Sequence, residues 1–144
     1  MGTSDCAELA ELWTQPRVRE YLGGVLPQEE ALKRTASIVA RPNTWAVELI
    51  EQDKVIGIVT LSERDHETEI SYMFLPECWG NGYALESCRA VVKFAFDALG
   101  LSEVIAVTQS ANEPSRRLLV ALGMSPVRTF VEFDAEQVEY RLKR

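Results

Sequence analysis

The sequence predicts an α/β fold in which a mixed, mostly antiparallel sheet is covered by helices. Two changes of hydrophobic period lead to this prediction. Apolar residues recur at helical spacing over about the first forty positions and then alternate to about position 76. Helical and alternating segments succeed one another from there on. The resulting order of helices, three strands, helix, strand, helix and two strands fits neither a barrel nor a regular βαβ repeat.

The first part of the chain predicts three helices separated by proline and glycine. The expected ranges are 4–15, Arg17–Leu22 and a segment from Pro27 to Arg41. Proline is favoured at the first position of a helix, and acidic residues in the first turn of the third segment complement the helix dipole. The first helix should present Leu9, Leu12 and Trp13 as its apolar stripe.

Three antiparallel strands are expected next. Their predicted ranges are Thr44–Glu51, Val55–Leu61 and 67–76, with polar turns at 52–54 and Glu63–Glu67. Side chains alternate between the two faces of a strand. The third strand therefore places Ile70, Tyr72 and Phe74 on one face and Glu69, Ser71 and Met73 on the other.

The second half of the chain alternates helix and strand. A glycine-bearing loop at Pro76–Gly82 leads into an apolar helix that Gly100 should terminate. The expected elements are a helix at Tyr83–Leu99, a strand at Glu103–Gln109, a helix at 113–122, and strands at Ser125–Phe133 and Gln137–Leu142 with a turn at Asp134-Ala135.

Composition limits the function classes. The 144 residues suit a single domain, 1–144, and the formal net charge of −7 argues against a general nucleic-acid binder. An acidic surface suits a cationic or amine partner, or simply serves solubility. The three cysteines and one histidine favour neither a disulfide framework nor a metal site. No secretory signal and no long apolar span is recognisable, so we expect a cytoplasmic protein without a membrane partner.

The loop before the second-half helix is typical of an anion site. Gly80 and Gly82 allow backbone N–H groups to turn inward, and the following helix start adds unpaired donors and a favourable dipole. A pyrophosphate is the natural occupant. The loop lacks the Lys-Ser/Thr of a Walker motif, and only the first half of the dinucleotide fingerprint is present. A tight strand-to-helix turn without a ligand is the alternative.

Asn112 and Ser115 form a second candidate element, at the start of the 113–122 helix. Asparagine is among the preferred helix N-caps, and a hydroxyl in the first turn can be merely solvated. Taken alone, each of these residues is therefore better explained structurally than functionally.

Together the two segments resemble the GNAT superfamily of acetyl-CoA-dependent N-acetyltransferases, and more narrowly its RimJ/RimL-like branch, which acetylates ribosomal-protein N-termini. The resemblance covers nearly the whole chain. It rests on the run Trp79-Gly80-Asn81-Gly82-Tyr83-Ala84-Leu85-Glu86-Ser87, on Asn112-x-x-Ser115, on Leu122-Gly123-Met124, and on the opening segments Asp5–Leu9 and Val18–Leu22.

The resemblance implies a role for each matching position. The backbone of Met73, Phe74 and Leu75 would pair with the pantetheine arm of acetyl-CoA as an added strand. Backbone N–H groups would cradle the pyrophosphate; they belong to Trp79, Gly80, Asn81, Gly82, Tyr83 and Ala84. Asn112 would hydrogen-bond the cofactor from the far side of the cleft. Ser115 would protonate the leaving thiolate, directly or through water.

The general base is assigned to Glu69, with Glu48 as the alternative, and a backbone N–H near Phe74 would polarise the thioester carbonyl. The sequence departs from the family pattern in three ways. Glu77 stands where a Gln or Arg is frequent, Leu119 replaces a tyrosine general acid, and the first edge strand of the fold is missing from the expected element order.

We therefore expect an enzyme that transfers acetyl from acetyl-CoA to a primary amine, either a protein N-terminus or a small molecule. No metal is implied, and because family members often dimerise, a homodimer remains open. A catalytically weak acyl-CoA-binding regulatory module and an ATP-binding protein are the alternatives. The sequence leaves the acceptor open among peptides, polyamines, aminoglycosides and amino acids.

Overall fold

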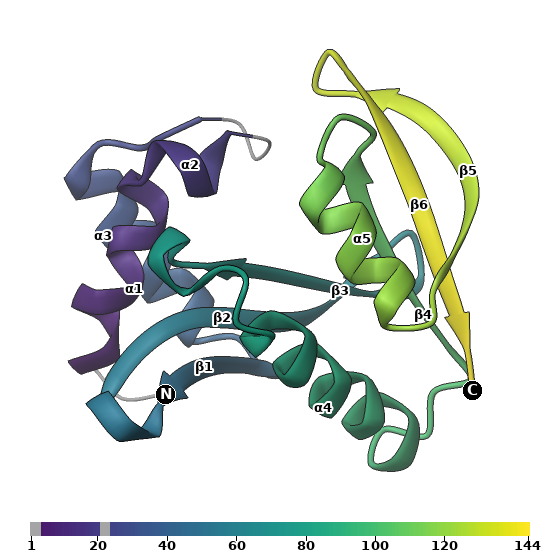
Figure 1. Ribbon diagram of the computed structural model, residues 1–144, viewed down its shortest axis with the longest axis horizontal. Coiled ribbons are helices and arrows are strands. Elements are labelled where there is room, and N and C mark those ends of the chain that lie inside the picture. Colours follow the sequence, from purple (N-terminus) through teal and green to yellow (C-terminus); the bar gives the residue numbers. More distant parts are fainter. Residues whose placement is uncertain (1–3, 21–23) are drawn as a thin grey trace. The chain divides into compact units, whose positions relative to one another are not determined.

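A computed structural model describes residues 4–20 and 24–144 and confirms the predicted α/β class (Figure 1). The helices are α1 (Ser4–Thr14), α2 (Pro16–Arg19), α3 (Gln28–Val39), α4 (Tyr83–Asp97) and α5 (Glu113–Ala121), with short 3₁₀ turns η1 (Ile50–Gln52) and η2 (Pro76–Cys78). The strands are β1 (Thr44–Leu49), β2 (Lys54–Arg64), β3 (Glu67–Phe74), β4 (Glu103–Gln109), β5 (Ser125–Glu132) and β6 (Ala135–Lys143).

The chain divides into two compact units. Unit 1 comprises Met1–Thr60 and Tyr72–Tyr83, and unit 2 comprises Leu61–Ser71 and Ala84–Arg144. β2 and β3 contribute to both units, because each strand crosses a boundary.

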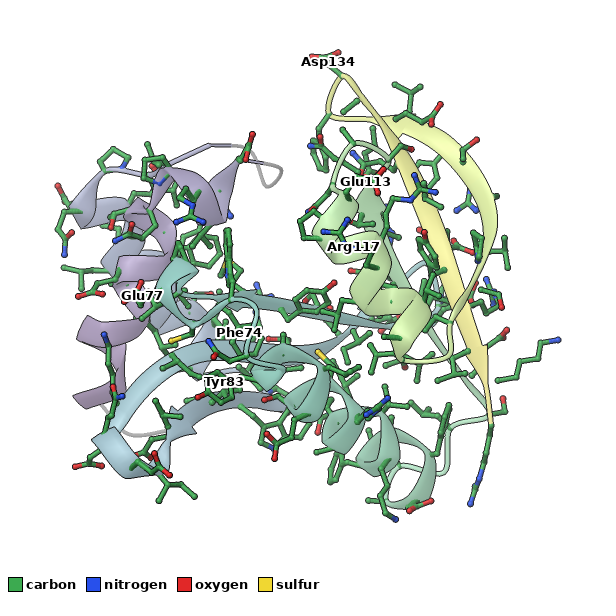
Figure 2. All side chains as sticks on the ribbon, viewed as in Figure 1. Phe74, Glu77, Tyr83, Glu113, Arg117 and Asp134 are labelled. Carbon is green, nitrogen blue, oxygen red and sulfur yellow. The ribbon has the colours of Figure 1, made fainter. Side chains whose placement is uncertain are left out.

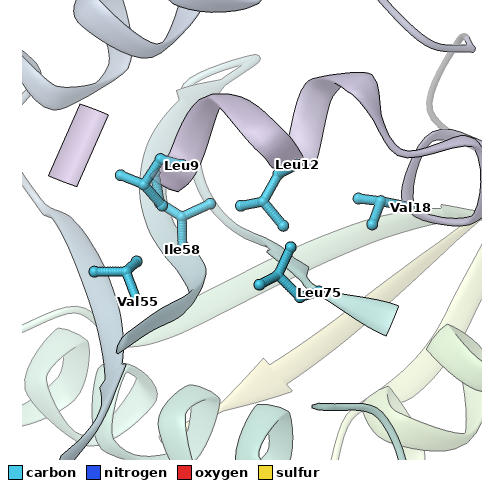
Figure 3. Close-up of a cluster of buried hydrophobic side chains, with 6 residues drawn as sticks. All are labelled: Leu9, Leu12, Val18, Val55, Ile58 and Leu75. Atoms are coloured by element: carbon cyan, nitrogen blue, oxygen red, sulfur yellow. The ribbon is translucent and has the colours of Figure 1, made fainter. Parts of the chain in front are cut away.

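Unit 1 is organised around a cluster of buried side chains from its helices and strands (Figure 3). Its members are Leu9, Leu12, Val18, Val55, Ile58 and Leu75. Two of them, Val55 and Ile58, share a face although they are three residues apart. They can do so because Val47 pairs with Gly57 and Glu48 with Val55, so the β1–β2 register skips Ile56.

The strands are neighbours in the order β1-β2-β3-β4-β6-β5. The β1–β2, β4–β6 and β5–β6 pairs are antiparallel, and β3 pairs with β4 in parallel. A two-residue turn joins β2 to β3, and both of its residues, Asp65 and His66, have positive φ, as in a tight hairpin. The sheet is therefore mixed and mostly antiparallel, as expected.

Several predicted boundaries differ from the structure by a few residues, and the positions of two turns are wrong. β2 continues to Arg64, through part of the expected polar turn, because Arg64 is held by a bidentate pair with Glu132 of β5. The last hairpin turns at Phe133-Asp134 rather than Asp134-Ala135, and both turn residues have positive φ, 54° and 58°. Phenylalanine is rare in that conformation, so residue preference misplaces the turn by one position.

In unit 2, the apolar sides of α4 and α5 are buried. Cys88, Val92 and Ala95 of α4 are buried, as is Leu119 of α5. Gly100 follows α4 with φ of 66°, which confirms it as the helix terminator. None of the described helices is long and apolar enough to cross a membrane.

Candidate functional site

The glycine loop, residues 79–83, leads from η2 into α4 with a backbone that requires glycine at two positions. Gly80 and Gly82 have φ of 81° and 80°, in the left-handed region that other residues rarely adopt. A Cβ atom built on either glycine would meet no atom within 4 Å. The requirement is therefore conformational, and the space above both glycines is open to a ligand.

The polar side chains of the loop brace its own backbone. The indole Nε1 of Trp79 donates to the carbonyl of Phe74 at 2.9 Å. The side-chain Nδ2 of Asn81 lies 3.2 Å from the carbonyl of Cys78 and 3.3 Å from that of Trp79. Arg17 of α2 lies over the Trp79 ring, with its guanidinium carbon 4.9 Å from the ring centroid. Side chains thus brace the loop, and the backbone N–H of Trp79 donates to the Pro76 carbonyl at 3.1 Å.

Glu77, in η2, is itself part of an ion pair. Its Oε1 lies 3.3 Å from Nζ of Lys54. A hydrogen bond from its own backbone N–H and then the Lys54 ammonium hold the pKa of Glu77 below its ordinary value. A charged carboxylate here offers no attraction to an anion, so any contribution of this position to phosphate binding falls to the backbone. Figure 2 labels Phe74, Glu77 and Tyr83 along this segment.

At the end of β3, the backbone N–H and C=O of Phe74 point away from β2. The backbone N–H of Leu75 donates to the carbonyl of Ile56 at 2.8 Å. Since a trans peptide points its N–H and C=O in opposite directions, the Phe74 carbonyl faces the other edge of β3, and the Phe74 N–H faces that edge too. The Phe74 carbonyl accepts a hydrogen bond from the Trp79 indole. The Phe74 N–H is the donor directed to the edge of β3 that faces away from β2.

Gly57 of β2 allows the end of β3 to pack closely against it, and the sequence analysis did not single this glycine out. A Cβ on Gly57 would lie 2.4 Å from Cδ1 and 2.6 Å from Cε1 of Phe74, and 2.7 Å from the carbonyl oxygen of Met73. Phe74 itself is buried. An isolated glycine inside the apolar run VIGIV is a known sign of close backbone approach, and that signal could have identified it.

Asn112 caps α5 in unit 2. Its Oδ1 accepts from the backbone N–H of Ser115 at 3.2 Å, which confirms the structural role. The cap uses the side-chain oxygen, and the amide nitrogen remains the donor that a cofactor carbonyl would need. Ser115 is half-buried in the first turn, and Leu119, at the family's tyrosine position, is buried.

The two arginines of α5 differ in their surroundings. Arg116 donates to the Tyr140 hydroxyl at 3.1 Å and to the Ser110 carbonyl at 3.2 Å, which gives it a structural role. Arg117 is exposed, and its Nη1 lies 3.9 Å from an oxygen of Glu113 (Figure 2).

Glu69 lies on β3 in unit 2, and its side chain is only 16% exposed. Nη1 of Arg64 is 3.8 Å from its Oε2, while Nη2 of the same arginine bonds both oxygens of Glu132 at 2.9 and 3.1 Å. Burial is the largest effect and raises the pKa of Glu69, against the lowering effect of Arg64. A raised pKa makes the carboxylate a stronger base, which suits a group that accepts a proton.

Other titratable groups are less suited to chemistry. Glu48, the alternative base, is exposed on β1, opposite the bulge at Ile56 of β2. His66 is exposed in its turn, 3.6 Å from Glu63. Burial raises the pKa of the Cys88 thiol to about 12 and also raises that of Cys78, so both favour the unreactive thiol form.

The predicted residues thus fall into two groups. The strand end and the glycine loop lie in unit 1, whereas Asn112, Ser115 and Glu69 lie in unit 2. Sequence reasoning missed Gly57, the Lys54–Glu77 pair and the Arg64–Glu132 pair.

Comparison with known proteins agrees with the predicted resemblance to GNAT acetyltransferases. The family model described as "Acetyltransferase (GNAT) domain" matches residues 1–125. The chain is 30% identical over 131 residues to the uncharacterized N-acetyltransferase YoaA of Bacillus subtilis, covering 83% of this chain and 73% of that protein.

Solved structures share the fold at lower identity. A GNAT-family acetyltransferase from Bacillus anthracis superposes with a TM-score of 0.90 at 23% identity, covering 99% of this chain and 91% of that one. The ribosomal-protein-S5-alanine acetyltransferase of Vibrio fischeri gives 0.79 at 18% identity over 99% and 90%. Aminoglycoside acetyltransferase AAC(6')-Ib in complex with coenzyme A gives 0.82 at 17% identity over 100% and 92%.

These structures show that one fold serves different acceptors, so the fold does not define the amine. The family model spans most of the chain and the B. subtilis relative most of the same region. The chain therefore belongs to the GNAT acetyltransferase family and, with it, to the acetyl-CoA-dependent N-acetyltransferases.

Proposed function

We propose that the protein transfers the acetyl group of acetyl-CoA to a primary amine, either a protein N-terminus or a small molecule. The observation that carries the proposal is the glycine loop. Its two glycines are left-handed, with open space above them, and it opens directly into α4. A helix start preceded by such a loop is suited to a pyrophosphate.

Acetyl-CoA would be held mainly by backbone groups. The loop N–H groups of residues 80–84 would bind the pyrophosphate, because the formal net charge of −7 gives no long-range attraction for an anion. The Trp79 N–H, also expected to contribute, already donates to the Pro76 carbonyl. The edge of β3 at Met73–Leu75 would pair with the pantetheine arm. The Asn112 amide nitrogen would donate to a pantetheine carbonyl while its oxygen keeps the helix cap.

The reaction is a direct attack. The amine nitrogen forms a bond to the thioester carbon, the carbon–sulfur bond breaks, and coenzyme A leaves as a thiol. Glu69 would take the proton from the amine, directly or through water, and Ser115 would supply a proton to the leaving sulfur. The Phe74 N–H would polarise the carbonyl during attack. The half-buried carboxyl of Glu69, with its raised pKa, supports its assignment over the exposed Glu48.

The finer assignments rest on the sequence resemblance. We assign the chain to the RimJ/RimL-like branch, with residues 1–144 acting as one acetyltransferase domain in the cytoplasm and a homodimer as its assembly. The match of the family model across both compact units supports the single domain.

An acetyl-transfer screen tests the function. The protein is incubated with acetyl-CoA and separate panels of peptides and small amines, and products are identified by mass spectrometry while free thiol is measured. We expect one panel to yield an N-acetylated product with stoichiometric coenzyme A. Binding of acetyl-CoA without turnover on any amine would favour the regulatory module, and tighter binding of ATP than of acetyl-CoA would favour the nucleotide-binding alternative. The Gly82→Val variant serves as the binding-deficient control.

A further inference from the structure

The two arginines of α2 both lie over tryptophan rings, and they differ in what else holds them. Arg19 is buried over the Trp13 ring, and its Nε donates to the carbonyl of Gly24 at 2.8 Å. Arg17 is exposed, and its guanidinium lies over the Trp79 ring. Among the described residues, no carboxylate or carbonyl oxygen is bonded to the Arg17 guanidinium. Its N–H donors are therefore available to an oxygen of a ligand.

The position of Arg17 is set by the buried residues that follow it. Val18 belongs to the same apolar cluster as Leu75, which comes directly after β3 (Figure 3). Arg19 is buried as well. Because these two residues are held in the interior of unit 1, the backbone of α2 is anchored where Arg17 reaches Trp79.

Trp79 is a fixed platform at the start of the glycine loop. Its indole Nε1 is bonded to the carbonyl of Phe74 at 2.9 Å, which orients the ring, and the residue is still 42% exposed. Gly80, with its left-handed φ of 81°, follows directly. A cation over an indole is attracted by the ring while its charge stays accessible to solvent. Arg17 therefore holds a positive charge beside the glycine loop.

The glycine loop has no cation of its own. The segment Pro76–Gly82 contains neither lysine nor arginine. Lys54 reaches this segment, but it pairs with Glu77 at 3.3 Å, so the two charges offset each other. Arginine binds phosphate oxygens with a planar fork of N–H donors, and a guanidinium already oriented by a ring loses less entropy on binding. Arg17 can thus supply the charge that the loop lacks.

We propose that Arg17 binds the pyrophosphate of acetyl-CoA, as the side-chain partner of the backbone N–H groups of the glycine loop. The inference rests on the proposed function, because it takes acetyl-CoA as the ligand. It assigns a charged contact to α2, which precedes the loop by about sixty residues in the sequence. The Trp79 ring orients this contact.

Ligands that differ in phosphate content test the assignment. Arg17→Gln is compared with the unaltered chain for binding of coenzyme A, dephospho-coenzyme A, which lacks the 3′-phosphate, and pantetheine, which lacks every phosphate. Affinities are measured by calorimetry, with competition titrations for the weak ligand. We expect about tenfold weaker binding of coenzyme A and dephospho-coenzyme A, and an unchanged affinity for pantetheine.

Two further variants separate the planar fork from charge in general. Arg17→Lys keeps the charge without the fork and should weaken coenzyme A binding about threefold. Arg41→Gln is the matched control, because it removes another exposed arginine of unit 1 and changes the net charge equally. We expect it to leave all three affinities unchanged. Thermal unfolding verifies that every variant is folded.

The outcomes that contradict the proposal are distinct. Equal losses for pantetheine and coenzyme A would reduce Arg17 to a structural role, and a loss confined to coenzyme A would place it on the 3′-phosphate. An unchanged coenzyme A affinity with a raised KM for the amine would place it on the acceptor. Normal coenzyme A binding by both the unaltered chain and Arg17→Gln would overturn this assignment alone, whereas an unaltered chain that fails to bind coenzyme A would overturn the proposed function as well.

Discussion

The glycine loop of unit 1 and the charged network of unit 2 are stabilised in opposite ways. The loop is defined by backbone conformation, with two left-handed glycines and hydrogen bonds to its own carbonyls. The charged network is defined by side chains from several strands: Arg64, Glu67, Glu69, Glu103, Arg128, Glu132, Glu139 and Arg141. The loop should therefore fail when a backbone angle is forbidden, and the network should respond gradually to changes of charge.

The largest effect is expected at Gly57 in unit 1, whose backbone lies directly against the Phe74 side chain. Gly57→Ala would place a methyl group against the Phe74 ring and the Met73 carbonyl. Overpacking of this kind costs about 1–3 kcal/mol. We expect a lower Tm in thermal unfolding and weaker acetyl-CoA binding by calorimetry, because the strand end must shift.

A double variant locates the clash of Gly57→Ala. Combined with Phe74→Leu, which removes the ring, the Gly57→Ala change should cost less than it does alone, giving a measurable coupling between the two sites. A Gly57→Ala protein with unaltered Tm and affinity would show that the strand end tolerates the methyl group, against the close approach described here.

The second effect isolates the glycine loop. Gly82→Val forces a β-branched residue into φ near 80° and should cost about 1–3 kcal/mol of loop conformation. We expect acetyl-CoA affinity, measured by calorimetry, to fall about tenfold or more. Gly24→Val is the matched control, because Gly24 also has positive φ, 84°, and open space at Cβ, yet lies outside the loop. Equal loss of affinity in both variants would argue against a phosphate-binding role for the loop.

The contrast between the glycine loop and the charged network also explains which features the sequence could predict. Glycines 80, 82 and 100 mark conformations that few other residues adopt, so the loop and the end of α4 were predictable from local sequence. Residue types near the hairpin tip were misleading, because Phe133 occupies a conformation that favours glycine, asparagine or aspartate.

The charged network lay beyond local reasoning. Arg64 bonds Glu132 across 68 residues and Arg141 bonds Glu67 across 74. Nothing in the local pattern of a polar turn reveals such a partner, so β2 was predicted too short. The partial burial of Glu69, and with it the direction of its pKa shift, likewise depends on strands that pair only in the folded chain.

A smaller effect is expected from Ser115, a side-chain position in unit 2. Ser115→Ala keeps the backbone N–H that bonds Asn112, so the helix cap survives. If the hydroxyl protonates the leaving sulfur, kcat should fall about tenfold to a hundredfold while acetyl-CoA affinity is retained. Ser110→Ala, which removes a hydroxyl bonded to Glu136 at 2.7 Å, is the control and should leave kcat unchanged. Parallel losses of kcat and affinity would indicate a binding or structural role.

The smallest effect, a shift in pH dependence, is expected within the charged network. Burial raises the pKa of Glu69, Arg64 lowers it, and the negative charges of Glu132, Asp65 and Glu139 raise it further. A base must be deprotonated to act, so activity should fall as pH drops through this raised pKa. Glu132→Gln removes a negative charge and releases Arg64 toward Glu69, so the acid limb of kcat should move to lower pH.

Arg64→Gln should move that limb the other way, because it removes a positive charge that favours the charged carboxylate. Shifts of up to about one pH unit in opposite directions are expected in kcat profiles, since one unit corresponds to 1.36 kcal/mol of differential interaction. The pH dependence of the unfolding free energy tests the same assignment independently. When the pKa of a group is higher in the folded state than in the unfolded state, the group adds stability at low pH. That stability is lost as the pH rises through the folded-state pKa. Glu69→Gln should therefore flatten that fall in unfolding free energy and abolish the acid limb. Profiles that shift in the same direction for both neighbours would remove Glu69 from the reaction and leave the network with a structural role alone.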